Sequence, residues 1–126
     1  MKIRNLMTLA LAAAVLAACG NNSPIGTVDV QRVASNWTKY QDFQNQLSAD
    51  EAQIQQSKVS TGQKIRMGAA LQQKYAKITD GLTQEIRDAA TKVANDRKLK
   101  LVVTREGVGY GGVDITPDVE KATPTP

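Results

Sequence analysis

Residues 32–98 contain two apolar stripes with helical spacing, which constrain the fold more than any other feature of the sequence. The first steps by four and three residues as a heptad seam, with Gln44 and Glu51 as its two polar members among Val33, Trp37, Tyr40, Gln44, Leu47, Glu51 and Ile54. The second contains Met67, Leu71, Tyr75, Ile78, Leu82, Ile86, Ala89 and Val93. Ser60 and Gln63 between them have the spacing of a capping box. The pattern predicts two long helices folded into an antiparallel hairpin, with its turn between Ser57 and Gly68.

Segments on either side of the hairpin have the composition of strands. Residues 25–30 are rich in β-branched side chains, and residues 99–104 alternate with a period of two. The four glycines of residues 107–112 indicate a turn with a short strand or bulge, and Thr116-Pro117-Asp118 has the order of a helix start, with threonine as the cap. We expect an α+β fold in which a hairpin arm (residues 32–98) leaves a small β-sheet body, followed by a disordered tail at 123–126.

The first 18 residues have the features of an export signal. Lys2 and Arg4 form a basic head, and the uncharged run of residues 6–18 is too short to span a bilayer as a helix. Leu16-Ala17-Ala18-Cys19 is similar to the bacterial lipobox. That resemblance implies cleavage before Cys19, lipidation of its side chain and a tether at 19–24. The alternative is an ordinary secretory signal in which the cysteine is incidental.

The position after the cysteine bears on where the protein would be anchored. Gly20 stands where some inner-membrane lipoproteins carry a retaining aspartate. The resemblance therefore implies an envelope protein on a membrane that faces the periplasm, with the outer membrane favoured.

The composition argues against several classes of function. The net charge is +4 and falls by two when Lys2 and Arg4 are removed, which is too mild to indicate a nucleic-acid partner. One cysteine cannot form a disulfide within the chain, and the absence of histidine makes a transition-metal site improbable. There is no acid–base or nucleophile pattern and no phosphate-binding loop, so we expect neither an enzyme nor a cofactor. The few aromatic residues predict a thin core, which favours oligomerisation.

At both ends of the hairpin the chain resembles the Skp (OmpH) family of cell-envelope chaperones. The resemblance covers about residues 25–122 and is carried by residues 25–30, 93–95 and 99–103, and more specifically by Val108-Gly109-Tyr110 and residues 114–119. It implies a homotrimer in which small strands form a shared body and three hairpins enclose unfolded outer-membrane proteins without ATP. The positions that it assigns to the trimer body are Val28, Val30, Leu101 and Val103. The lipobox and a shorter arm depart from the best-known members, which are soluble.

Two sets of residues in the hairpin are candidates for binding such clients. Residues 52–79 contain no acid and five bases, namely Lys58, Lys64, Arg66, Lys74 and Lys77. These bases could attract anionic lipid headgroups or acidic client segments, or they could simply form a solvated helix face. Met67, Leu71 and Tyr75 either belong to the seam within the hairpin or offer apolar contacts to a client. Trp37 and Tyr40 are expected to pack at the root of the arm rather than to form a ligand platform.

Two functions follow as hypotheses. The first is a lipid-anchored, ATP-independent holdase that binds unfolded envelope proteins through its arms. The alternative is a structural coiled-coil lipoprotein that acts as a spacer or scaffold in the envelope. Reversing the charge of the five bases would distinguish them, because only the holdase would lose client affinity.

Overall fold

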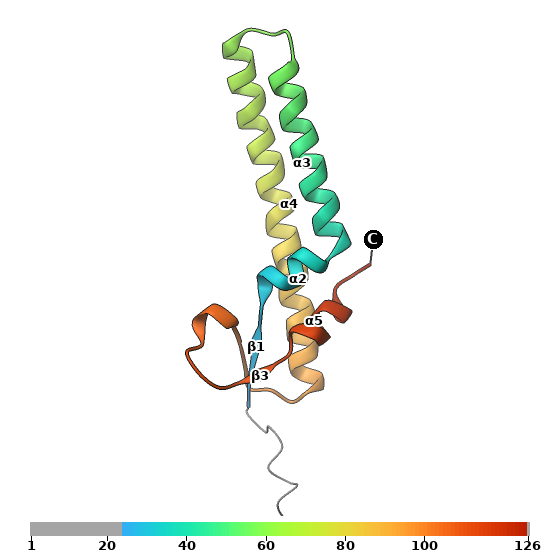
Figure 1. The fold of residues 1–126 in the computed structure, drawn as a ribbon, viewed down its shortest axis with the longest axis vertical. Helices are drawn as coiled ribbons and strands as arrows, with labels where there is room; N and C mark the ends of the chain where they lie inside the picture. The colour runs from blue at the N-terminus through green and yellow to red at the C-terminus, as the bar shows by residue number, and fades with distance from the viewer. Residues whose placement is uncertain (1–23, 126) are drawn as a thin grey trace, which may run out of the picture.

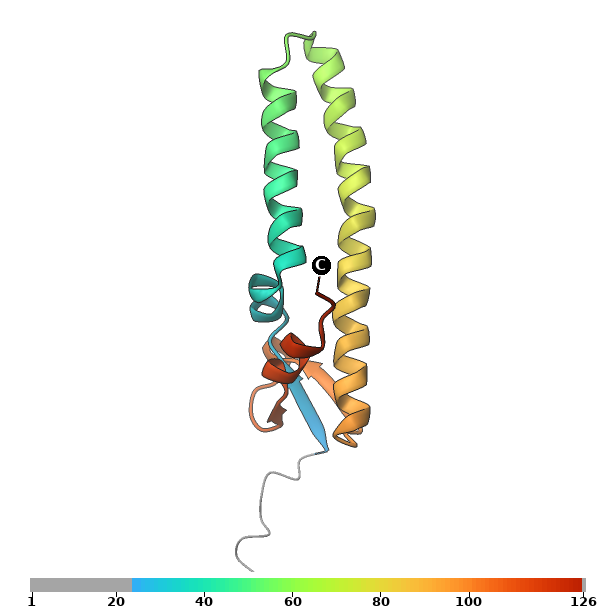
Figure 2. The same ribbon diagram turned by 90° about the vertical axis from the view of Figure 1, so that its right-hand side faces the viewer.

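The computed structural model describes residues 24–125. Two long helices, α3 (Thr38–Gln56) and α4 (Thr61–Asp96), lie side by side and extend away from a small sheet (Figures 1 and 2). The expectation of long helices combined with a small sheet is therefore confirmed. Residues 24–125 include no helix that is both long and apolar enough to cross a membrane. The export signal, Cys19 and tether residues 20–23 lie outside the described residues.

The link between α3 and α4 comprises residues 57–60, at the early end of the expected range. The Ser60 hydroxyl accepts a hydrogen bond from the Gln63 backbone N–H at 3.3 Å, and the Gln63 side chain accepts one from the Ser60 N–H at 3.1 Å. The predicted capping box is thus present, and it satisfies two backbone donors that a helix start leaves free.

The expectation of one helix from Arg32 onward, preceded by a strand to Val30, is wrong. A short helix, α2 (Val30–Asn36), comes first, and the extended backbone of Trp37 separates it from α3. The Asp29 side chain accepts a hydrogen bond from the Arg32 N–H, which caps α2 and ends the preceding strand. Val30, assigned to a strand of the trimer body, is therefore the first residue of a helix.

Three parallel strands form the sheet in the order β2-β1-β3. They are β1 (Ile25–Val28), β2 (Leu101–Thr104) and β3 (Val113–Asp114). The register pairs Ile25 with Leu101 and Gly26 with Val113, so the three strands begin at one end of the sheet. A β-carbon at Gly26 would lie 2.8 Å from a Leu99 methyl carbon, so glycine allows this close packing. The strands from the two ends of the sequence form one sheet, as expected.

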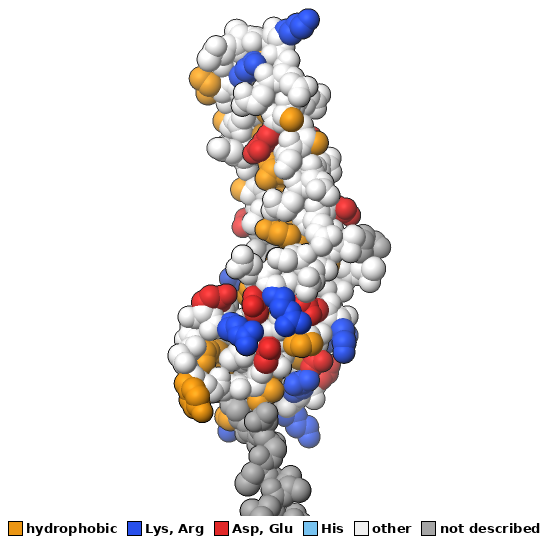
Figure 3. Space-filling view, viewed as in Figure 1, with side chains coloured by type: hydrophobic (Ala, Val, Ile, Leu, Met, Phe, Trp, Pro, Cys, Tyr) orange, Lys and Arg blue, Asp and Glu red, His pale blue; other side chains and the backbone are white. Residues whose placement is uncertain are grey.

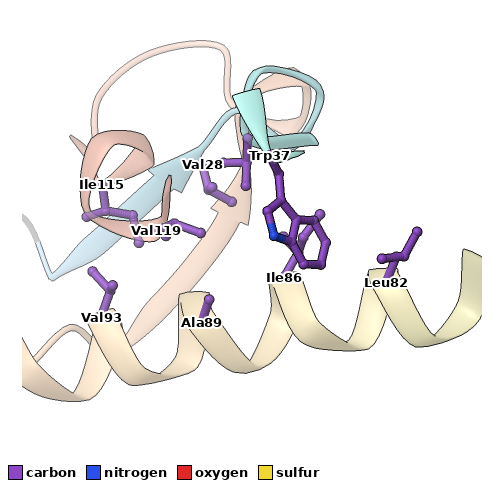
Figure 4. Close-up of a cluster of buried hydrophobic side chains, with 9 residues drawn as sticks. Val28, Trp37, Leu82, Ile86, Ala89, Val93, Ile115 and Val119 are labelled. Atoms are coloured by element: carbon purple, nitrogen blue, oxygen red, sulfur yellow. The ribbon is translucent and has the colours of Figure 1, made fainter. Parts of the chain in front are cut away.

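The core lies between the sheet, the second half of α4, α2 and the short helix α5 (Thr116–Ala122). Its buried members are Val28, Val33, Trp37, Leu82, Ile86, Ala89, Val93, Ile115 and Val119. Figure 4 shows how those of β1, α4 and the start of α5 lie around Trp37. We call the sheet, the second half of α4, α2 and α5 the body. The second apolar stripe of the sequence is therefore divided. Its later residues, Leu82 to Val93, pack in the body, Tyr75 packs against Phe43 of α3, and Met67 and Ile78 are exposed.

Thr116 has a different role from the helix cap that its sequence suggests. Ile115 occupies the cap position of α5 and makes no side-chain cap bond. The Thr116 hydroxyl instead accepts a hydrogen bond from the Asp29 backbone N–H at 2.9 Å, and the residue is fully buried. This bond ties the start of α5 to the end of β1.

The end of the described chain is also held in place. The Trp37 indole N–H donates to the Pro124 carbonyl at 2.7 Å, and the Thr123 hydroxyl donates to the Glu120 carbonyl at 2.8 Å. The expectation of a disordered tail is therefore wrong for Thr123 and Pro124. With 4% of its surface exposed, Trp37 packs at the root of the helices as expected.

Candidate client-binding surface and assembly groove

The five bases predicted to bind clients have different surroundings. Lys64 donates to the Gln55 carbonyl at 2.6 Å across the link, and Lys74 forms a 3.0 Å salt bridge with Asp50 on α3. Lys58, Arg66 and Lys77 are exposed and form no salt bridge within residues 24–125. Three of the five cations are therefore free to meet an external anionic group.

The three apolar candidates on α4 also differ in how far they are exposed. Met67 is 40% exposed and Leu71 is half-buried, whereas Tyr75 is 5% exposed. The Tyr75 ring packs against Phe43 with centroids 5.4 Å apart, and its hydroxyl donates to Asp50 at 2.7 Å. Of the two alternatives given for Tyr75, the structure therefore matches the seam and not an exposed client-binding position, because this side chain faces α3. Met67 remains available on the surface.

Asp50 is the residue that sequence reasoning missed in this contact, because it lies beside the predicted seam and not on it. Hydrogen bonds from Tyr75 and then Lys74 lower the pKa of its carboxyl group from 3.8. The hydrogen bond to Asp50 raises the pKa of the Lys74 ammonium, and burial, followed by the same carboxylate, raises the pKa of Tyr75. All three groups therefore favour the ionisation states in which this contact between α3 and α4 forms.

Acidification is expected to weaken this contact. Because the folded-state pKa of Asp50 is lowered, its contribution to stability is present above 3.8 and is lost as the pH falls through the lowered value. We predict that Asp50→Asn reduces the drop in thermal midpoint between neutral pH and about pH 3. Circular dichroism melts across this range measure the effect. Asp80→Asn, which makes the same change at an exposed acid of α4, is the matched control. Equal drops in the parent and in Asp50→Asn would refute the prediction.

The far end of the helix pair, residues 54–67, also exposes apolar side chains that sequence reasoning did not select. Ile65 is 68% exposed and Val59 is 38% exposed. Ile65 borders a groove of about 550 Å³ between α3 and α4, together with Leu47 and Leu71. The sequence did contain a sign of this exposure: Ile65 lies outside the apolar stripe, so helical periodicity alone places its side chain on the surface.

The four residues predicted for the trimer body line one groove of about 680 Å³ between β2 and the second half of α4. Leu101 is 52% exposed, and Val30 and Val103 are half-buried. Val28 is 4% exposed and belongs to the core of its own chain. Within residues 24–125, strand β2 pairs with β1 alone and is therefore an edge strand. The groove thus combines an apolar lining with an unpaired strand edge.

Charged side chains on the body form a network that joins its elements. On the face shown in Figure 3, acidic and basic side chains gather over the body. Arg32 pairs with Glu120 at 3.1 Å, which links α2 to α5. Hydrogen bonds from the side chain and then the backbone of Thr116 lower the pKa of Asp114. The bonded partners of these groups are neighbouring elements of the fold, so we assign the network a structural role.

Comparisons with known proteins do not decide the family. No protein-family model matches the chain, no curated protein matches it, and no solved structure matches it. The resemblance to the Skp (OmpH) family therefore stays a prediction that is based on the sequence motifs.

Proposed function

We propose that this chain is an ATP-independent holdase of the Skp type, in which α3 and α4 act as an antiparallel hairpin arm that binds unfolded envelope proteins. The observation that carries the proposal is the mixed surface at the far end of the helix pair. Exposed Ile65, Met67 and Val59 lie there within 10 residues of the unpaired cations Lys58 and Arg66. Such a surface offers many weak apolar contacts and attracts acidic segments, which suits clients that share no sequence.

The proposed assembly is a homotrimer joined through the groove beside β2. The groove supports this assignment because it leaves Leu101 half-exposed and β2 without a second partner strand. An unpaired edge of this kind is an available site for association with another chain. Burial of the groove would also supplement the thin core of a single chain.

The proposed location is the periplasmic side of a membrane, with Cys19 as the lipidated residue and the outer membrane favoured. The lipobox-like sequence before Cys19 is the support for this part of the proposal. Mass spectrometry of the protein from a bacterial envelope tests it directly, through the mass of an acylated N-terminal cysteine. A mature N-terminus at another residue would contradict it.

The holdase activity is tested by suppression of aggregation. Purified trimer should prevent aggregation of a urea-denatured outer-membrane protein on dilution, as measured by light scattering. We expect the triple variant Lys58→Glu, Arg66→Glu, Lys77→Glu to lose most of this activity at low ionic strength. The difference from the parent should shrink as salt rises, because exposed charges are screened over about 8 Å at physiological salt.

A matched variant separates the position of the charges from the net charge. Lys92→Glu, Lys98→Glu, Lys121→Glu changes the net charge equally at exposed positions of the body, and it should retain the parent's activity. Equal losses in the two triple variants would contradict the role of the exposed cations on the helix pair. If the parent itself fails to suppress aggregation at several-fold excess, the spacer or scaffold function is favoured instead.

A further inference from the structure

One end of the body is the end from which the chain continues toward Cys19. The strands β1, β2 and β3 all begin there, and the C-terminal end of α4 leads into β2 at the same place. Pro24 is the first described residue, and its carbonyl accepts a hydrogen bond from the Lys100 N–H at 2.8 Å. In Figures 1 and 2 this end lies opposite the link between α3 and α4. We call it the base.

A fully exposed aromatic side chain lies in the loop that leads into the base. Tyr110 is 102% exposed, and residues 107–113 carry no charge. Gly111 and Gly112 follow with φ of +90° and +89°, a conformation that favours glycine. A β-carbon at Gly112 would lie 2.6 Å from the methyl group of Thr27, so the loop runs close against β1. Two glycines thus hold a tyrosine in solvent at a site next to the start of the sheet.

Cations gather at the same end of the body. Residues 96–100 contain Arg97, Lys98 and Lys100 and a single acid, Asp96. Arg97 is paired with Asp118, whereas the side chains of Lys98 and Lys100 are exposed and form no salt bridge within residues 24–125. The base therefore presents positive charge at the same end of the body as the exposed side chains of Tyr110 and of Ile25, which is 37% exposed.

We propose that the base is a membrane-contacting surface that rests on a phospholipid layer containing anionic headgroups. Tyrosine is suited to the boundary between headgroups and acyl chains because its ring is apolar and its hydroxyl is polar. The lysines face the negative surface potential of such a layer. Chain length supports this occupant: Cys19 precedes Pro24 by five residues, which span at most about 17 Å. The proposal rests on the proposed anchoring at Cys19.

This surface lies largely apart from the assembly groove. The groove lies beside β2, whereas the Tyr110 loop leads into β3 at the opposite edge of the sheet. Among Ile25, Lys98, Lys100 and Tyr110, Lys100 alone also lines the groove. A trimer joined beside β2 therefore leaves Tyr110 and Lys98 available to lipid.

In the test of this proposal the lipid anchor is attached by chemical coupling, so the result does not depend on acylation in the cell. Because the core lies within residues 24–125, a chain that starts at Cys19 retains it and can be coupled through this single cysteine to a maleimide lipid. The vesicles contain phosphatidylglycerol together with phosphatidylcholine that is brominated on its acyl chains. The bromine atoms quench the fluorescence of a tryptophan that lies at the membrane boundary. Tyr110→Trp places a probe on the base, and Ile65→Trp places an exposed control probe at the far end. The parent chain without coupled lipid gives the background fluorescence emission of Trp37.

We expect Tyr110→Trp to show a blue shift and a loss of emission on coupling, and Ile65→Trp to show neither. Adding Lys98→Gln and Lys100→Gln to Tyr110→Trp should reduce the loss. Emission from Tyr110→Trp that is unchanged on coupling, or equal losses at both probes, would overturn the proposal. Failure of cellular acylation would instead appear in the mass of the envelope protein, so the two proposals can fail separately.

Discussion

Trp37→Ala is expected to remove a large part of the stability of the body. Trp37 is 4% exposed and lies among core residues from β1, α2, α4 and α5 (Figure 4). Truncation of a buried tryptophan to alanine costs about 3–5 kcal/mol, because the lost burial is added to the cost of the remaining cavity. A domain of this size has a free energy of unfolding of about 5–15 kcal/mol. The variant should therefore be marginally folded.

Urea unfolding at one fixed protein concentration measures this loss, since the stability of an oligomer depends on concentration. Trp37→Phe is the matched control: it keeps an aromatic ring in the cavity and removes the indole hydrogen bond to Pro124. We expect Trp37→Phe to lose much less free energy of unfolding than Trp37→Ala, because the Pro124 carbonyl is near solvent and can accept a hydrogen bond from water. A loss below about 1 kcal/mol for Trp37→Ala would show that the side chain is not the central core residue.

The helices could be predicted because each repeats one apolar stripe over many turns. A long stripe must be buried, so Leu82, Ile86 and Val93 could be assigned to a buried face from their spacing alone. Ser60 and Gln63 were equally predictable, because a capping box depends only on local sequence. Local rules therefore predicted the two long helices and the start of the second.

The helix break at Trp37 could not be predicted in the same way. The heptad spacing continues from Val33 through Trp37 to Tyr40, so periodicity gives no sign of a change in direction. Trp37 is held at this break by a tertiary contact. Its indole N–H donates a hydrogen bond to the carbonyl of Pro124, which is 87 residues away in the sequence. A contact between distant segments leaves no periodic signal in either of them.

The candidate surfaces, like the helices, could be predicted from the sequence only in part. The cluster of cations that includes Lys58 and Arg66 is visible in the sequence as a run without acids, whereas the pairing of Lys74 in the same run with Asp50 is not. The inward orientation of Tyr75 depends on Asp50 across the pair of helices, so it required the relative register of α3 and α4. Leu101 and Val103 were assigned to the trimer body only through the resemblance to the Skp (OmpH) family, and in the structure both line the groove beside β2.

Leu101→Lys is expected to convert the proposed trimer to monomers while leaving the body folded. Leu101 is 52% exposed in the single chain and lines the groove beside β2. Arg87 and Lys100 also line the groove, and no acid is among its lining residues. A lysine buried there by association would therefore lack a partner, which costs about 3–5 kcal/mol. Lysine on an edge strand also opposes strand pairing between chains.

Sedimentation equilibrium measures the expected change, a weakening of association by roughly a hundredfold or more at each interface. The matched control is Ile65→Lys, which introduces the same side chain at an exposed apolar residue of the far end. This control should sediment as the parent does, and both variants should keep the parent's circular dichroism spectrum. A parent that is monomeric at all concentrations would contradict the proposed trimer. If Leu101→Lys retained the trimer, the interface would have to lie away from β2, because a charged side chain cannot be accommodated in this groove without loss of affinity.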